Sequence, residues 1–148
     1  MKEYPFLDLK AVNAPVMADL EQAALRVIRS GRYIGGSEVD DFENRLAAMT
    51  GTRCAVGVSN GLDALRLIFK AYIEMGRLSK GDKVLVPANT YIASVLAVTD
   101  AGLEPVFVDA SAETMNMDTS LIEQAISSGV RSILTVHLYG RPCFDCAM

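Results

Sequence analysis

The chain has 148 residues, of which 51% are hydrophobic and 22% are charged, and its formal net charge at pH 7 is −4. This length and balance suit one domain with a sizeable core. The acidic charge, with no cluster of basic residues, argues against nucleic acid as a partner. No stretch approaches the roughly 20 apolar residues that a membrane span needs.

The first ten residues and the cysteines indicate in which cellular compartment the protein is expected. The first ten residues lack the apolar segment and cleavage site of a secretory signal. The three cysteines are an odd number, which argues against a secreted disulfide framework. We therefore expect a soluble, cytoplasmic protein without membrane contact.

Apolar residues at helical spacing predict two helices in the first third of the chain. Asn13 is a capping residue type, and Pro15 falls in a first turn where its missing N–H costs nothing. Glycines are expected to end both helices. The predicted segments are an extended arm over 1–12, a helix from Asn13 to Gly31, a linker over 32–36 and a helix capped by Ser37 that ends at Gly51.

Beyond Arg53, short apolar runs alternate with helical patterns. Strands are predicted at 54–58, 83–86, 104–109 and 131–138, with helices at 60–74, 90–100 and from 118 or 119 to about 126. Buried strands alternating with helices indicate a mostly parallel sheet covered on both faces. The predicted fold class is α/β, a three-layer sandwich, and no linker divides residues 1–148 into domains.

Ligands of such sheets bind beyond the carboxyl ends of the strands. The loop Ser59-Asn60-Gly61 joins a predicted strand to a helix start, where unpaired N–H groups and the helix dipole favour an anion such as phosphate. Gly61 would let a ligand approach the backbone. The alternative is a capped turn that holds no ligand.

Other residues at the same predicted edge are candidates with ordinary structural alternatives. Tyr91 could offer an aromatic face to a planar ring or pack in the core, and Asp109 could face the cleft or cap a turn. His137 could bind substrate or be a hydrogen-bonded structural histidine. In the glycine-rich turn 31–36, Tyr33 and Ile34 could contact substrate, or the turn could simply reverse the chain.

Several other chemistries lack their signatures. The sequence has neither the glycine-rich dinucleotide fingerprint nor a P-loop, and it has no G-x-S-x-G elbow. One histidine cannot build a multi-histidine metal site, so no metal site is predicted. The pair Cys143 and Cys146 could be a redox pair or half of a zinc site, but it lies five residues or fewer from the end of this sequence.

Taken together, the motifs resemble the DegT/DnrJ/StrS family of pyridoxal-phosphate-dependent sugar aminotransferases. The strings that carry the resemblance, in family order and at similar spacing, are 31–39 with Phe42-Glu43, 56–65, 86–94, 105–109 and 136–140. Each string alone is weak, but five in register cover essentially the whole chain.

The resemblance implies the N-terminal part of a fold-type-I aminotransferase large domain, spanning residues 1–148, which normally forms a homodimer or higher homo-oligomer. It implies that the turn at Asn60 and the backbone of Gly61-Leu62-Asp63 hold the phosphate of pyridoxal 5′-phosphate and that Tyr91 stacks on its ring. The implied substrates are a nucleotide-linked keto-sugar and an amino donor, usually glutamate. Residues Tyr33, Ile34 and His137 are the candidates for contact with them.

The departure from the family pattern concerns the catalytic groups. Family members are more than twice as long, and their ring-nitrogen aspartate and Schiff-base lysine lie beyond the position of Met148. None of the five lysines, Lys2, Lys10, Lys70, Lys80 and Lys83, matches that lysine. Since transamination needs this amine, we expect an inactive fragment with no catalytic residue of its own. Two alternatives are a non-catalytic dimerisation or ligand-binding module and, from Cys143 and Cys146, a redox or metal protein.

Overall fold

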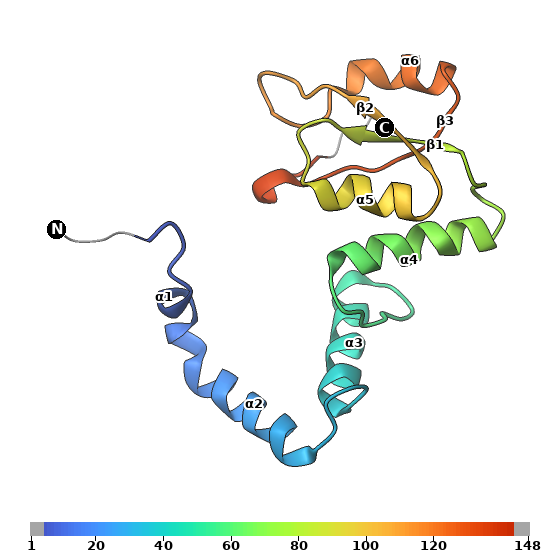
Figure 1. The fold of residues 1–148 in the computed structure, drawn as a ribbon. Helices are drawn as coiled ribbons and strands as arrows, with labels where there is room; N and C mark the ends of the chain where they lie inside the picture. Colours follow the sequence, from blue (N-terminus) through green and yellow to red (C-terminus); the bar gives the residue numbers. More distant parts are fainter. Residues whose placement is uncertain (1–4, 144–148) are drawn as a thin grey trace. The chain divides into compact units, whose positions relative to one another are not determined.

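The computed structural model describes residues 5–143, which divide into two compact units, one ending at Gly57 and the other beginning at Val58 (Figure 1). The first unit is helical. Its elements are α1 (Leu9–Asn13), the 3₁₀ helix η1 (Ala14–Val16), α2 (Met17–Ser30) and α3 (Ser37–Thr50).

The ends of α2 and α3 lie where the sequence predicts them. Gly31 and Gly51 follow these helices with φ of +66° and +69°, a left-handed conformation that glycine adopts without strain. The predicted extended arm is wrong over α1, because Asp8 caps this helix by accepting a hydrogen bond from the N–H of Ala11 at 3.0 Å. Gly36, rather than Ser37, is the N-cap of α3.

The first unit buries little of its apolar surface. Ala47 is its one buried residue among those described. Helix α2 has no buried residue, although Leu20, Ala24, Val27 and Ile28 recur along it at helical spacing. Both hydrophobic clusters of the described residues lie in the second unit.

The predicted strand at 54–58 is wrong. Among the described residues no strand pairs with this segment, and most of it is exposed. A strand is stabilised by its ladder, so an apolar run without a neighbouring strand does not become one. Its backbone instead uses side chains: the N–H of Gly57 donates to Glu43 Oε1 at 2.5 Å, and Thr52 donates to the Cys54 carbonyl at 3.2 Å.

The second unit is an α/β arrangement around a parallel sheet in the order β2-β1-β3. Its elements are α4 (Gly61–Glu74), β1 (Lys83–Pro87), α5 (Ile92–Asp100), β2 (Glu104–Val108), the 3₁₀ helix η2 (Thr119–Leu121), α6 (Ile122–Ser127), β3 (Val130–Ile133) and the 3₁₀ helix η3 (Leu138–Gly140). No described helix is long and apolar enough to cross a membrane.

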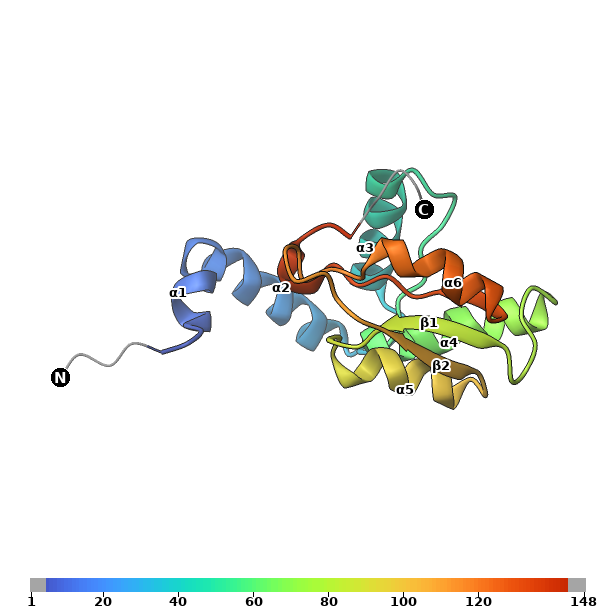
Figure 2. The same cartoon turned by 90° about the horizontal axis from the view of Figure 1, so that it is seen from above.

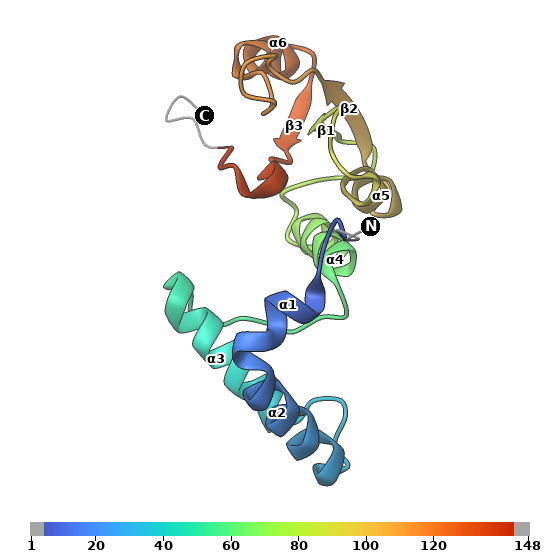
Figure 3. The same ribbon diagram turned by 90° about the vertical axis from the view of Figure 1, so that its left-hand side faces the viewer.

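The central strand β1 explains why helices cover both faces of this sheet. Val84 and Val86 are fully buried in one cluster with Phe69 of α4 and Val98 of α5. Leu85 points to the opposite face, as the period of two in a strand requires, and lies in the cluster that includes residues of α6. Figure 3 shows the resulting three layers, with α4 and α5 on one side of the strands and α6 on the other.

The remaining differences concern element ends. The last strand was expected to reach residue 138, but β3 ends at Ile133 and the Leu134 N–H adds one more bond, to the Leu85 carbonyl at 2.8 Å. Helix α5 starts at Ile92 rather than at residue 90. The helix expected after Asp118 begins as a 3₁₀ turn, where Asp118 caps Ser120.

Replacing Leu85, which is 1% exposed, tests the role of the central strand. Leu85→Ala should lower the free energy of unfolding by about 2–5 kcal/mol, because it leaves a cavity on one face of the sheet. Leu67→Ala, at a position 52% exposed on α4, is the matched control and should change it by less than about 0.5 kcal/mol. Urea denaturation followed by circular dichroism measures both, and equal losses would contradict the packing described here.

Candidate functional site

The starts of α4 and α5 lie at the same end of the sheet as the carboxyl end of β1 (Figures 1 and 2). Tyr91 is the N-cap residue of α5, follows β1 by four positions and is 76% exposed. The alternative in which Tyr91 packs in the core is therefore wrong. An aromatic side chain at the ligand-binding edge of a parallel sheet is available to a planar ligand.

The turn before α4 is fixed by the side chain of Asn60. Its Oδ1 accepts a hydrogen bond from the N–H of Asp63 at 3.0 Å, and its carbonyl accepts one from the N–H of Ala64 at 3.0 Å. In the part of the chain that the structure describes, the N–H groups of Gly61 and Leu62 have no acceptor. A side chain added at Gly61 would meet nothing within 4 Å. Two backbone donors at the positive end of a 14-residue helix are thus left without an acceptor in this part of the chain.

The carboxylate of Asp63 stands beside these donors and is fully engaged. The hydroxyl of Ser59 donates to its Oδ2 in a short hydrogen bond, and Nδ2 of Asn60 donates to the same oxygen at 3.2 Å. Arg66 donates from Nη1 to Oδ1 at 2.9 Å. These donors, the Ser59 hydroxyl first, lower the pKa of Asp63 from its usual value.

Arg66 also ties α4 to the end of α5. Its Nε donates to Oδ2 of Asp100 at 2.7 Å, and its Nη2 makes a second, short contact with the same oxygen. Sequence reasoning missed Arg66 and Asp100. The spacing of Asp63 and Arg66, three residues apart on a predicted helix, would have suggested their pairing, but no local pattern connects Arg66 with a residue 34 positions away.

A surface hollow runs along the same side of α4. Six residues line it, namely Val58, Ser59, Asp63, Arg66, Leu67 and Lys70. Tyr91 is not among them, so the hollow follows the first three turns of α4 and does not join the Asn60 turn to the Tyr91 ring. Lys70 brings a second cation to this side of the helix.

The segment after β3 contains His137, the N-cap residue of η3. His137 is exposed, and its Nδ1 accepts a hydrogen bond from the N–H of Cys143 at 3.0 Å. In the neutral ring the proton is therefore on Nε2. Tyr139 in the same turn is fully exposed and has a φ of +51°.

The remaining sequence candidates divide between turns and buried positions. Asp109 follows β2, and its carbonyl accepts from the N–H of Asp118 at 3.0 Å, which fits a turn residue. Cys143 is buried, whereas Cys146 lies outside the described residues. Within residues 5–143 no group of three potential metal ligands occurs.

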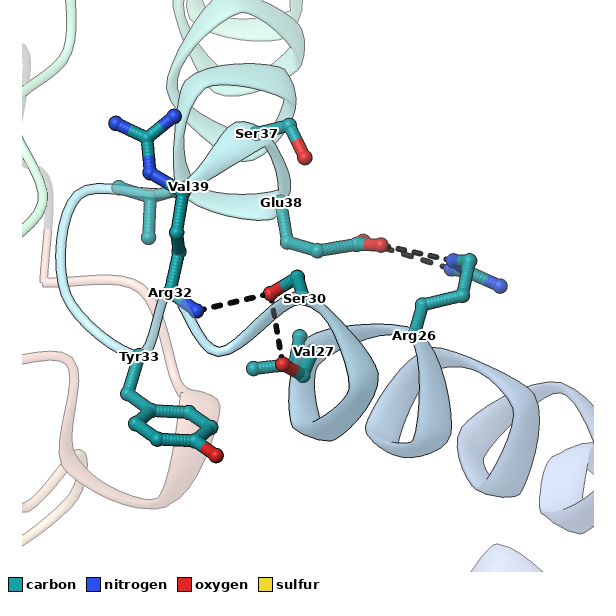
Figure 4. A pocket seen from close by; sticks show the side chains of 9 residues that line it. Arg26, Val27, Ser30, Arg32, Tyr33, Ser37, Glu38 and Val39 are labelled. Atoms are coloured by element: carbon teal, nitrogen blue, oxygen red, sulfur yellow. Dashed lines mark hydrogen bonds and ion pairs between the residues drawn. The ribbon is translucent and has the colours of Figure 1, made fainter.

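The glycine-rich turn of the first unit borders a small pocket between the end of α2 and the start of α3 (Figure 4). Arg26 and Glu38 line this pocket and form an ion pair, with 2.9 Å between Nε of Arg26 and Oε1 of Glu38. The hydrogen bond to Arg26 lowers the pKa of Glu38. The Ser30 hydroxyl fixes the turn, since it accepts from the Arg32 N–H at 3.1 Å. Tyr33 lines this pocket and is largely exposed.

Ile34 is 94% exposed and is not among the pocket's lining residues. A side chain of this size normally avoids water, so its exposure at the tip of a fixed turn is compatible with a contact role. The turn therefore presents both predicted contact residues, Tyr33 and Ile34, on its surface.

The lowered pKa of Asp63 predicts a specific dependence of stability on pH. A free aspartate titrates near pH 3.9, so around and below that pH the unfolded chain binds more protons at this site than the folded chain does. The stabilising effect of the Asp63 carboxylate is present above pH 4 and is lost as the pH falls through the folded-state pKa. The difference in unfolding free energy between the wild type and Asp63→Asn should therefore shrink from pH 6 to pH 3 in urea titrations. Parallel curves would contradict this assignment.

The sequence of this chain is similar to sequences of known proteins. Residues 16–147 match the model of the DegT/DnrJ/EryC1/StrS aminotransferase family. The chain is 48% identical over 139 residues to a dTDP-3-amino-3,6-dideoxy-alpha-D-galactopyranose transaminase from Aneurinibacillus thermoaerophilus, covering 94% of this chain and 37% of the relative. The chain thus spans little more than a third of that curated relative.

Solved structures agree in fold. The structure of DesV from S. venezuelae, in complex with a ketimine intermediate, superposes with a TM-score of 0.84 at 44% identity, over 96% of this chain and 37% of that one. The Streptococcus pneumoniae protein Spr1654, described as a putative sugar aminotransferase and solved in its PLP form, gives a TM-score of 0.70 at 37% identity, over 80% of this chain and 29% of that one. Together with the family match, these structures support pyridoxal phosphate as the cofactor. The chain belongs to the DegT/DnrJ/EryC1/StrS aminotransferase family.

Proposed function

We propose that these residues form the N-terminal part of the large domain of a pyridoxal-phosphate-dependent aminotransferase. Its proposed reaction transfers an amino group, from glutamate, to a nucleotide-linked keto-sugar. The observation that carries the proposal is the start of α4, where the N–H groups of Gly61 and Leu62 have no acceptor among the described residues. The family match over residues 16–147 supports the reading of this helix start as a phosphate site.

The phosphate would accept hydrogen bonds from the backbone N–H groups of Gly61 and Leu62. The Asp63 N–H already donates to Asn60, so the proposed set of donors is smaller than the three that the resemblance implies. Asn60 and Asp63 would instead hold the shape of the turn. Because both donors are backbone groups of one helix, their positions follow from the packing of α4 and not from flexible side chains.

Tyr91 would pack its ring against the pyridine ring of the cofactor. Its exposure at the start of α5 supports this role, since an aromatic side chain left in water gains from covering a planar ligand. When bound, pyridoxal phosphate supplies an electron sink for proton removal at the substrate carbon. The residues of this chain would bind and orient it.

Substrate contacts are proposed for Tyr33, Ile34 and His137. The exposure of Tyr33 and Ile34 on a fixed turn supports the first two. For His137, acceptance of the Cys143 N–H by Nδ1 fixes the orientation of an exposed ring.

The proposed assembly is a homodimer or a higher homo-oligomer. The apolar residues of α2 support it, because none of this helix is buried within its own unit. Exposed apolar surface of this kind is typical of an interaction surface.

Binding of pyridoxamine 5′-phosphate tests the cofactor site, because this ligand carries the phosphate and ring but has no aldehyde to react with surface amines. Fluorescence titration should show saturable binding of one ligand per chain. Tyr91→Ala should weaken it by about tenfold through loss of ring stacking, whereas Tyr91→Phe should keep most of it.

Tyr139→Ala removes another fully exposed tyrosine and is the control that should leave binding unchanged. Equal binding by the Tyr91→Ala variant and the wild type would contradict the role of Tyr91. Absence of saturable binding by the wild type would contradict the cofactor site itself.

We propose that these 148 residues by themselves have no aminotransferase activity, because none of their five lysines matches the family's catalytic lysine. After incubation with pyridoxal phosphate and borohydride, mass spectrometry should find no stoichiometric adduct on a single lysine, and aminotransferase activity should be undetectable. Lys70 is the lysine nearest in position to the candidate site's helix start that also lines the hollow beside α4, and it is tested by its own variant. A one-to-one adduct that disappears in Lys70→Arg would show that this chain carries its own covalent site.

A further inference from the structure

We propose that Arg66 and Asp100 are positioning residues for the phosphate site at the start of α4. They act through Asp63 and do not touch the ligand. This inference rests on the proposed function, and it adds a reason why a carboxylate can stand beside the binding site of a dianion.

Asp63 places a negative charge next to the two backbone donors. Asp63 occupies the third position of α4, one and two residues after Leu62 and Gly61, whose N–H groups would bind the phosphate. An isolated carboxylate here would repel a phosphate, since like charges close together are unfavourable. The site therefore needs a compensating positive charge.

Arg66 offsets the negative charge of Asp63 and is itself held in place by Asp100, so that the three side chains together carry a net charge of −1. Its guanidinium bridges Asp63 and Asp100, with Nη1 on the first carboxylate at 2.9 Å and Nε on the second at 2.7 Å. The planar, permanently charged guanidinium presents several donors in a fixed geometry, which suits this bridge better than a single ammonium group. All three side chains are one-third to two-fifths exposed, so the interaction is partly screened by water.

Hydrogen bonds to both carboxylate oxygens fix the orientation of Asp63. With Oδ1 bound by Arg66, the other oxygen, Oδ2, receives the Ser59 hydroxyl and Nδ2 of Asn60. Asn60 in turn caps the helix through Oδ1, which accepts from the Asp63 N–H. A chain of hydrogen bonds thus runs from the end of α5 through Arg66 to the turn that shapes the two free donors.

A simpler role for Arg66 and Asp100 would be purely structural, as an ion pair that holds α4 against α5. The two roles differ in what they predict for binding. If the role were purely structural, variants of these residues would lose stability and would bind every ligand of the site more weakly, to the same degree. A positioning role would weaken ligands that carry a phosphate and spare those that lack it.

The test compares pyridoxamine 5′-phosphate with pyridoxamine, by calorimetric titration of the full chain. In the wild type the phosphorylated ligand should bind much more tightly. Arg66→Gln should weaken it by roughly fivefold to tenfold, the effect of removing one hydrogen-bonded charge, and should leave pyridoxamine unchanged. Arg66→Lys, which keeps the charge, should recover part of the loss.

Two further variants separate charge from geometry. Adding Asp63→Asn to Arg66→Gln removes the uncompensated carboxylate and should restore part of the preference for the phosphorylated ligand. Asp100→Asn removes one negative charge, which by charge alone would favour the phosphate, but it also removes the anchor of the guanidinium. A loss of affinity in this variant, smaller than that of Arg66→Gln, would therefore report on geometry. Arg45→Gln, which breaks the exposed pair with Asp41 on α3, is the matched control and should change neither affinity.

The outcomes distinguish this inference from the proposed function. If the wild type shows no preference for the phosphorylated ligand, the phosphate site and the role of Arg66 both fail. If the wild type shows the preference and Arg66→Gln retains it, or loses affinity for both ligands equally, this inference alone is overturned. Thermal unfolding of each variant identifies any that fails to fold, and in that case the comparison of Asp100→Asn with the wild type decides.

Discussion

The burial of β1 on both faces is the constraint on which the second unit depends. Val84 and Val86 are packed under α4 and α5, and Leu85 under α6, so one five-residue strand joins the three layers. The parallel pairing of β2 and β3 with this strand places all carboxyl ends at one edge. The helix starts that carry the candidate site lie at that edge because each helix packs on the sheet that β1 holds together.

Much of this arrangement could be predicted from the sequence, because local patterns encode it. The glycine stops at Gly31 and Gly51, the Asn60 cap and the strand over 83–86 all follow from residue type and spacing. The run at 54–58 could not be decided this way. An apolar segment has the same local appearance whether or not a neighbouring strand is present, and only the ladder makes it a strand.

The candidate site shows the same division between local and distant information. A capped helix start is visible in the sequence, and so is an aromatic residue after a strand. The bridge from Asp63 through Arg66 to Asp100 depends on how α4 lies against α5. No local pattern in the sequence indicates that packing. Charge balance at the site is thus a tertiary property, although the two backbone donors that it serves are set by local structure.

The lack of buried residues in α2 has a consequence for how firmly this helix is held. An isolated helix of about 14 residues is marginal in water, since most helical stability in proteins comes from tertiary packing. Backbone amides in α2, none of whose residues is buried, should open with a small free-energy cost. Their protons would then exchange with deuterium far sooner than those of β1, unless another surface covers the helix.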